Sequence, residues 1–204
     1  MTDLTSKLNL HPQSKRPPPL CVYKDHCFTK QFCQNLIHKF DPLVESAEQF
    51  CERYDDRQNS RFVVFDQSLA DEIYTILRQN EITIPTHLKE GDTVLNFAGL
   101  HNKIRFCKYV KGDHFGKHYD YITTVHNKLV SRFTVMIYLN QDFEGGETRF
   151  LQHDFPHDLN FEIHPKEGDC IVFSQEDNRL LHEGAKVVSG VKYLLRTDAI
   201  YSIQ

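Results

Sequence analysis

The sequence predicts a mainly β chain, in which N-terminal helices pack against a C-terminal antiparallel sandwich or barrel. Short runs rich in β-branched and aromatic residues follow one another after residue 93, with no helical pattern between them. Turn-forming pairs such as Gly145-Gly146 and Ser189-Gly190 separate these runs. Two amphipathic helical patterns precede residue 93. With 204 residues, the chain has the length of one domain.

The first residues differ from the rest of the chain. Residues 1–20 are polar and end in three consecutive prolines, Pro17 to Pro19. Because proline lacks a backbone N–H and fixes its own φ, this segment favours neither a helix nor a central strand, and we expect a disordered tail. Residues 21–204 then form a single domain, with 21–92 as its helical support and 93–204 as its β core.

Two helices are expected in the support. Over residues 29–40, apolar side chains recur at helical spacing, from Phe32 to Phe40. A second apolar stripe covers residues 68–79, where Ser68 suits the N-cap and two acidic residues follow in the first turn.

Seven strands are expected in the β core. Several are almost unbroken apolar runs, which is typical of strands buried on both faces. They cover Lys103–Val110, Phe133–Asn140, Glu147–Leu151, Leu159–Ile163, Cys170–Ser174, Leu180–Val188 and Lys192–Ile200.

The composition argues against several classes of protein. A net charge of -4 gives no basic footprint for general nucleic-acid binding. No stretch approaches the ~18 apolar residues of a membrane span. Since the first residues show no secretory signal, we expect an intracellular, cytoplasmic protein. The 6 cysteines include no CxxC pair and are expected to be reduced thiols.

The segment His118-Tyr119-Asp120 is the main candidate for chemistry. In an extended strand, side chains two residues apart point to the same face, so this imidazole and carboxylate can bind one cation. His182, near the start of a late strand, is the best third ligand. Two histidines and one carboxylate, with the remaining positions open, form the facial triad of non-haem Fe(II) oxygenases. A lone His-x-Asp is a weak signal in a chain with 12 histidines, so the prediction depends on the complete set.

Two cations on a late strand are candidates for binding a carboxylate. Lys192 lies ten residues after His182, at the head of an apolar strand. It could bind the distal carboxylate of 2-oxoglutarate, whose 2-oxo acid end chelates iron. Arg196 shares its strand face and is the alternative anchor. Its other interpretation is an ion pair with Asp198 or another buried acid.

Seven sequence blocks follow one another within residues 99–201, a span of about half of the chain. They are residues 99–109 (GLHNKIRFCKY), 112–120 (GDHFGKHYD), 134–140 (TVMIYLN), 145–150 (GGETRF), 165–169 (PKEGD), 182–184 (HEG) and 190–193 (GVKY). Together they resemble the catalytic domain of Fe(II)/2-oxoglutarate-dependent dioxygenases, in the prolyl 4-hydroxylase-like branch. The N-terminal half resembles the family's helical support only loosely.

This resemblance implies a double-stranded β-helix, or jelly-roll, core flanked by helices. It assigns Fe(II) to the His118, Asp120 and His182 triad, and the distal carboxylate of 2-oxoglutarate to Lys192. The remaining cofactor-binding residues that it implies are Tyr109 and Tyr138, which would hydrogen-bond that carboxylate, and Thr148 beside it. For Tyr138 the other interpretation is a core aromatic residue of a buried strand.

The implied reaction is hydroxylation of an unactivated C–H bond with Fe(II), 2-oxoglutarate, O2 and ascorbate. The favoured substrate is a prolyl residue in a peptide or protein. The alternatives are a small molecule such as a free amino acid, or a non-catalytic jelly-roll binding module. The sequence does not indicate an oligomeric state.

Other classes are disfavoured by what the chain lacks. His182 is followed by no Arg-x-Ser, the last strand has no Arg-x-Asn-x-Thr-x-Arg run of nucleic-acid demethylases, and no His-x-His of the cupins occurs. A structural zinc site would need four ligands, mostly cysteines.

The polar loops 122–131 and 152–160, with Tyr119 and Arg149, are expected at the mouth of the barrel.

Overall fold

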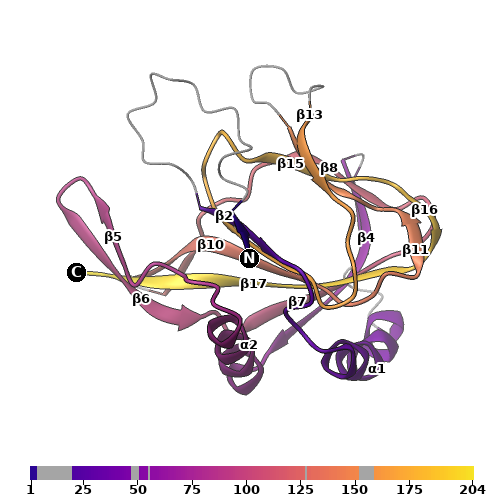
Figure 1. The fold of residues 1–204 in the computed structure, drawn as a ribbon, viewed down its shortest axis with the longest axis horizontal. Coiled ribbons are helices and arrows are strands. Elements are labelled where there is room, and N and C mark those ends of the chain that lie inside the picture. The colour runs from indigo at the N-terminus through magenta and orange to yellow at the C-terminus, as the bar shows by residue number, and fades with distance from the viewer. Residues whose placement is uncertain (4–19, 47–50, 55, 127, 152–158) are drawn as a thin grey trace.

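The computed structural model describes residues 1–3, 20–46, 51–54, 56–126, 128–151 and 159–204, which contain two helices and seventeen strands (Figure 1). The helices are α1 (Lys30–Ser46) and α2 (Gln67–Gln79). The strands are β1 (Thr2–Asp3), β2 (Cys21–Lys24), β3 (Cys51–Tyr54), β4 (Arg57–Phe65), β5 (His87–Glu90), β6 (Thr93–Leu100), β7 (Lys103–Tyr109), β8 (His114–His118), β9 (Thr124–His126), β10 (Leu129–Tyr138), β11 (Phe143–Gly145), β12 (Thr148–Leu151), β13 (Leu159–Ile163), β14 (Cys170–Ser174), β15 (Leu181–Gly184), β16 (Val187–Gly190) and β17 (Lys192–Ile203).

The strands form one large sheet that folds back over itself. Its main path runs β1-β2-β14-β10-β17-β7-β4-β8-β15-β12-β13, and β11 pairs separately with β16. In Figure 1, β8, β15 and β13 lie above the layer of β10, β17 and β7. Every strand pair is antiparallel. The predicted mainly β fold with a jelly-roll core is confirmed.

Two hydrophobic clusters lie on opposite faces of the β10-β17-β7 layer. One lies between this layer and the helices, which are below it in Figure 1, and includes Leu195 and Tyr201 of β17. The other fills the interior of the jelly roll and includes Leu194. Because side chains alternate along a strand, Lys192 and Arg196 share the interior face with Leu194. The predicted common face of these two cations is therefore present.

Both helices form where the apolar stripes predict them, although their ends differ. Helix α1 continues to Ser46, past Pro42, because Val44 extends the buried stripe. The N-cap of α2 is Asp66 and not Ser68, since the Asp66 carboxylate accepts a hydrogen bond of 2.9 Å from the Leu69 N–H.

The segment 21–92 is more than a helical support. Its strand β2 pairs with β14, and β4 pairs with both β7 and β8, so these strands belong to the main sheet. Such pairings join segments far apart in sequence, which local patterns do not reveal. Thr2 and Asp3 of the predicted tail also pair with β2, whereas residues 4–19 lie outside the described residues.

Several core strands also differ from the prediction. The run Leu180–Val188 is two strands, because the chain leaves β12 after β15 and pairs with β11 as β16. The predicted loop 122–131 contains β9, which pairs with β10. Of the second predicted loop, residues 152–158 lie outside the described part of the chain.

The described cysteine side chains are free thiols, as expected for reduced cysteines, and all are buried: Cys21, Cys27, Cys33, Cys107 and Cys170. In the described residues, neither helix has the length and apolar composition needed to cross a membrane.

Candidate active site

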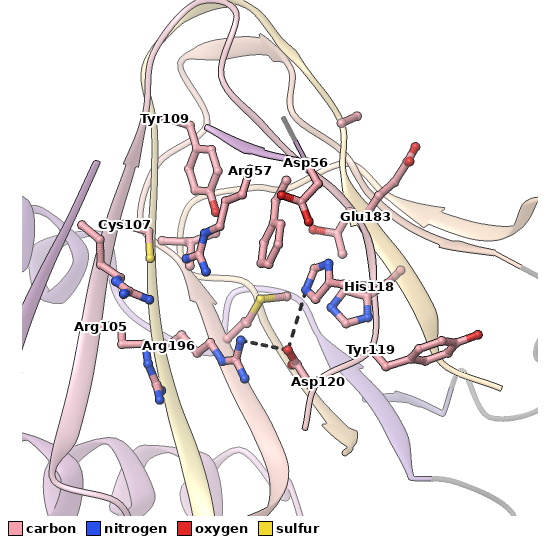
Figure 2. Close-up of a pocket in the computed structure, with 18 of the residues that line it drawn as sticks. Asp56, Arg57, Arg105, Cys107, Tyr109, His118, Tyr119, Asp120, Glu183 and Arg196 are labelled. Carbon is pink, nitrogen blue, oxygen red and sulfur yellow. Dashed lines mark ion pairs between the residues drawn. The ribbon is translucent and has the colours of Figure 1, made fainter. Parts of the chain in front are cut away.

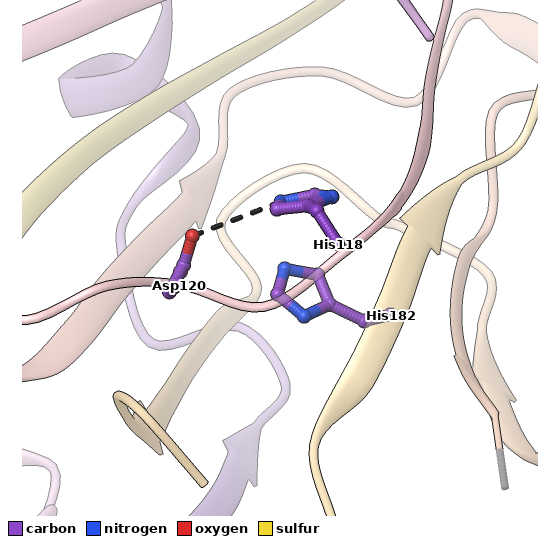
Figure 3. Close-up of side chains that lie close together, drawn as sticks. All are labelled: His118, Asp120 and His182. Atoms are coloured by element: carbon purple, nitrogen blue, oxygen red, sulfur yellow. Dashed lines mark ion pairs between the residues drawn. The ribbon is translucent and has the colours of Figure 1, made fainter. Parts of the chain in front are cut away.

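Two neighbouring strands bring the three predicted metal ligands together. His118 at the end of β8 lies opposite His182 of β15 in the antiparallel register. Asp120 lies two residues beyond β8. Each of the three offers one ligand atom, and these atoms all lie within 4.8 Å of one another (Figure 3).

Backbone hydrogen bonds orient both imidazoles. His118 Nδ1 lies 2.8 Å from the Gly116 carbonyl oxygen, and His182 Nδ1 lies 2.9 Å from that of Leu180. Because a carbonyl oxygen only accepts hydrogen bonds, each Nδ1 carries the proton. The lone pair of each Nε2 is therefore available to a cation.

Aromatic rings support the same imidazoles by packing. Phe115 stacks on His118 with ring centroids 3.6 Å apart. Phe150 and Phe173 pack against His182 at 5.4 Å and 5.0 Å. These contacts restrict the rotation of both imidazoles and thus hold the ligand geometry.

The third predicted ligand, Asp120, is buried and lies close to three polar side chains. Its Oδ2 accepts a hydrogen bond of 2.6 Å from Thr134 Oγ1. Its Oδ1 lies 2.9 Å from Arg196 Nη1 and 3.7 Å from His118 Nε2 (Figures 2 and 3). Oδ1 thus faces the histidines, while the hydrogen bond from Thr134 fixes the other oxygen.

The protonation states suit a divalent metal. Burial lowers the pKa of His118 to about 3, and it also lowers the pKa of His182, so both rings are neutral at neutral pH. Burial alone would raise the pKa of Asp120, but Arg196 and the two histidines outweigh it and hold that pKa below its ordinary value. Two neutral imidazoles and one carboxylate are the donor set that fits Fe(II).

Lys192 lies deeper in the interior, only 3% exposed. Its Nζ donates to the Gly146 carbonyl oxygen at 2.5 Å and lies over the rings of Tyr109 and Tyr138. Among the residues that the structure describes, no carboxylate lies within ion-pair distance of Nζ. Burial lowers the pKa of Lys192 to about 8, with Glu147 opposing the shift.

The remaining predicted cofactor-binding residues surround this lysine. Tyr109 pairs with Lys192 in the β7-β17 register. Tyr138 donates from its buried hydroxyl to Thr148 Oγ1 at 2.7 Å. Each of these side chains is at most 6% exposed. Burial raises the pKa of both tyrosines, so their hydroxyls stay protonated as hydrogen-bond donors.

A single cavity connects the triad to Lys192. It has a volume of about 420 Å³ and is lined by the three triad residues, Tyr109, Thr148 and Lys192 (Figure 2). Tyr119 also lines it, as expected for a residue at the mouth. Arg149 instead pairs with acidic residues, including Glu162 at 3.2 Å. Tyr138 is not one of the lining residues, but its hydroxyl contacts Thr148, which does line the cavity.

Sequence reasoning missed three arginines of this cavity: Arg57, Arg61 and Arg105. Arg105 lies two and four residues before Cys107 and Tyr109 on the same strand, so period-two alternation could have identified it. Arg57 and Arg61 belong to β4, whose place beside β7 depends on long-range pairing. Nothing in their local sequence marks them.

Comparison with known proteins agrees with this geometry. Residues 104–197 match the model of the 2OG-Fe(II) oxygenase superfamily. The match covers slightly less than half of the chain. An uncharacterised protein of fowlpox virus is 32% identical over 91 residues, which are 45% of this chain and 20% of the viral protein. The chain spans about a fifth of the length of this relative.

The fold is similar to those of solved prolyl hydroxylases. A viral collagen prolyl hydroxylase from Paramecium bursaria Chlorella virus-1 is similar over 97% of this chain and 100% of its own, with a TM-score of 0.62 and 21% identity. A Pseudomonas putida prolyl-4-hydroxylase has a TM-score of 0.60 and 12% identity to this chain, and the similarity covers 96% of both chains. A prolyl hydroxylase of Trichoplax adhaerens, in complex with a hypoxia-inducible-factor peptide fragment, has a TM-score of 0.65 and 13% identity. The similarity covers 96% of this chain and 86% of that one.

The superfamily match agrees with the predicted resemblance to Fe(II)/2-oxoglutarate-dependent dioxygenases. At such identities the structural neighbours establish the fold. The superfamily match implies Fe(II), 2-oxoglutarate and O2 as the reactants that such a domain uses.

Proposed function

We propose that this chain is an Fe(II)- and 2-oxoglutarate-dependent dioxygenase that hydroxylates an unactivated C–H bond of a prolyl residue in a peptide or protein. The observation that carries the proposal is the convergence of two neutral imidazoles and one carboxylate on a cavity that also contains a deeply buried lysine. The prolyl hydroxylase fold and the peptide bound to one structural neighbour favour the substrate class.

The chain's own residues would divide the work between two ends of the cavity. His118, Asp120 and His182 would hold Fe(II) through two Nε2 atoms and one carboxylate oxygen. Lys192 would bind the distal carboxylate of 2-oxoglutarate, with Tyr109 and the Tyr138–Thr148 pair as neutral donors beside it.

When bound, the iron and its cosubstrate supply the oxidising power, so that R–H, O2 and 2-oxoglutarate become R–OH, succinate and CO2. The protein supplies orientation and a shielded environment. The stacked Phe115 and Phe150 hold the imidazoles in place, and Thr134 fixes one oxygen of Asp120. Burial keeps Lys192 and its tyrosines away from competing solvent, which strengthens their interaction with a carboxylate.

The test is succinate release from 2-oxoglutarate by the purified full chain with Fe(II) and ascorbate, with and without a library of proline-containing peptides. Peptide-stimulated release supports the proposal. If the protein bound neither Mn(II), used as an oxygen-stable probe, nor 2-oxoglutarate, the proposal would be wrong and a non-catalytic module would take its place.

A further inference from the structure

A chain of hydrogen bonds between buried side chains lies behind Asp120. Its members are Ser131 and Thr134 of β10 and Gln175, the residue that directly follows β14. Ser131 and Thr134 are fully buried, and Gln175 is 6% exposed. Because polar groups in a protein interior are costly without partners, the bonds that these side chains form determine how they are oriented.

The amide of Gln175 uses both of its ends. Its Nε2 donates to Thr134 Oγ1 at 3.1 Å and to Asp198 Oδ1 at 2.9 Å, and its Oε1 accepts from Ser131 Oγ at 2.6 Å. The carboxylate of Asp198 forms ion pairs with two arginines and only accepts hydrogen bonds. The nitrogen of the Gln175 amide therefore faces Asp198 and Thr134, and the flipped orientation is excluded.

The far end of the chain begins at the rim of the cavity. Ser131 Oγ accepts a hydrogen bond of 2.8 Å from the N–H of Thr123, a residue that lines the cavity. The proton of the Ser131 hydroxyl then goes to Gln175 Oε1. Ser131 thus fixes the oxygen end of the amide, while Asp198 fixes its nitrogen end.

The near end of the chain is the hydroxyl of Thr134. Its oxygen accepts from Gln175 Nε2 at 3.1 Å and from Arg196 Nη2 at 3.4 Å. Its single proton points to Asp120 Oδ2, which lies 2.6 Å away. Since Gln175 presents a donor and no acceptor on this side, Asp120 does not compete with it for that proton.

The segment after β14 also binds the backbone of Asp120. The N–H of Glu176 donates to the Asp120 carbonyl oxygen at 2.7 Å. The N–H of Gln175 is bound in turn to the Arg132 carbonyl oxygen at 2.9 Å. Two consecutive residues therefore hold Asp120, one through its main chain and the other through Thr134 and its side chain.

We infer that Gln175 is a positioning residue for Asp120. It acts through Thr134, whose donated proton occupies Oδ2 and leaves Oδ1 facing the two histidines. This inference rests on the proposed function, in which Asp120 is a metal ligand. A carboxylate with one oxygen already bound needs little reorganisation to offer the other to a cation, and outer partners of this kind contribute to metal affinity.

The experiment measures the dissociation constant of Mn(II) by isothermal titration into the full chain. Gln175→Glu keeps the shape of the side chain but replaces the donating nitrogen with an acceptor, which competes with Asp120 for the Thr134 proton. The added acid would by itself attract a cation, so an effect of charge alone would tighten Mn(II) binding. Thr134→Val removes the hydroxyl, and Thr134→Ser retains it.

We expect Gln175→Glu and Thr134→Val each to weaken Mn(II) binding by about 10-fold, as is typical for loss of an outer partner of a metal ligand. Thr134→Ser should restore most of the affinity. The two losses should not multiply, because Gln175 acts through Thr134. The double variant should therefore bind Mn(II) about as weakly as Thr134→Val alone.

The matched control is Asn80→Asp, at the end of α2 and outside the cavity. The Asn80 amide nitrogen also donates twice, to the carbonyl oxygens of Cys27 and Ile76 at 3.1 Å and 3.0 Å. Loss of these donors should lower the melting temperature and leave the Mn(II) affinity unchanged.

Unchanged or tighter Mn(II) binding by Gln175→Glu overturns the inference, provided that the variant folds. If it does not fold, Gln175→Met, which removes both donors without adding a charge, is judged by the same criterion. Losses that multiply in the double variant also overturn it, since Gln175 would then act independently of Thr134. If the wild-type chain does not bind Mn(II), the proposed function itself fails, and this inference fails with it.

Discussion

Lys192 and Arg196 lie four residues apart on one face of β17, yet their surroundings differ. Arg196 lies 2.9 Å from Asp120 and 3.6 Å from Asp198, and it is partly accessible at 20% of its side chain. Lys192 is 3% exposed, and its partners among the described residues are a backbone carbonyl and two aromatic rings. Arg196 therefore neutralises acids of the protein, whereas the charge of Lys192 suits an incoming anion.

This difference bears on an alternative that the sequence left open, namely which cation anchors 2-oxoglutarate. Because Arg196 forms an ion pair with Asp120, it belongs to the end of the cavity where the proposed metal ligands lie. A buried lysine without a carboxylate is costly unless a ligand provides one. We therefore propose Lys192 as the anchor and Arg196 as a partner of Asp120.

The largest effect should follow loss of a triad ligand. His182→Ala removes one of the two proposed imidazole ligands, and turnover of 2-oxoglutarate should fall by more than about 100-fold. Thermal stabilisation by Mn(II) should be lost as well. The matched control is His164→Ala, because His164 is 70% exposed and pairs with Glu162 at 3.1 Å, away from the cavity. Full activity of His182→Ala would refute the triad assignment.

Substitution of the two β17 cations tests the comparison directly. Lys192→Ala should weaken 2-oxoglutarate binding by about 100-fold, since it removes the buried charge that meets the distal carboxylate. Arg196→Ala should weaken it much less and should mainly alter Mn(II) affinity through Asp120. Isothermal titration of both ligands into both variants gives the ranking. The reverse ranking would move the anchor to Arg196.

The pH dependence of cosubstrate binding should report on Lys192. Its pKa is lowered to about 8 in the folded protein, so the lysine is charged below that pH and neutral above it. The affinity for 2-oxoglutarate should therefore decline as the pH rises through about 8. Lys192→Arg keeps its charge throughout this range and should lack the decline. An identical decline in Lys192→Arg would assign the titration to another group.

The lowered pKa of Lys192 also affects the free energy of unfolding of the protein. The unfolded chain keeps a proton on this lysine up to its ordinary pKa of 10.5, whereas the folded chain releases it near pH 8. Since the unfolded state binds more protons in this window, the contribution of Lys192 to the free energy of unfolding should rise with pH between these two values. Chemical denaturation of the wild type and of Lys192→Ala measures this contribution.

The smallest effect should come from the neutral donors beside Lys192. Tyr138→Phe removes the hydroxyl that binds Thr148 and should cost about 1 kcal/mol of stability, with a few-fold loss of 2-oxoglutarate affinity. Tyr201→Phe is the matched control, because its buried hydroxyl binds the Pro85 carbonyl in the other hydrophobic cluster. It should lose stability without any change in 2-oxoglutarate binding.

Local sequence patterns were sufficient to predict much of the fold and of the candidate site of this protein. The apolar stripes predicted both helices, and the punctuated β-rich runs predicted most core strands. The even spacing of Lys192 and Arg196 placed them on one face. The ordered blocks around His118, Asp120 and His182 predicted the superfamily. The helices, the strands and the shared face depend on side-chain periodicity, which neighbouring residues determine, whereas the superfamily was predicted by resemblance to a known family.

Other features depend on contacts between segments far apart in the chain. The pairing of β4 with β7 and β8 turns the predicted helical support into part of the sheet and brings Arg57 and Arg61 into the cavity. Whether a cation is paired with acids or left for a ligand also depends on cross-strand neighbours. Periodicity indicates which face of a strand a side chain occupies. Its burial and its electrostatic partners arise only when the strands assemble into the sheet, and it is in burial and partners that Lys192 and Arg196 differ.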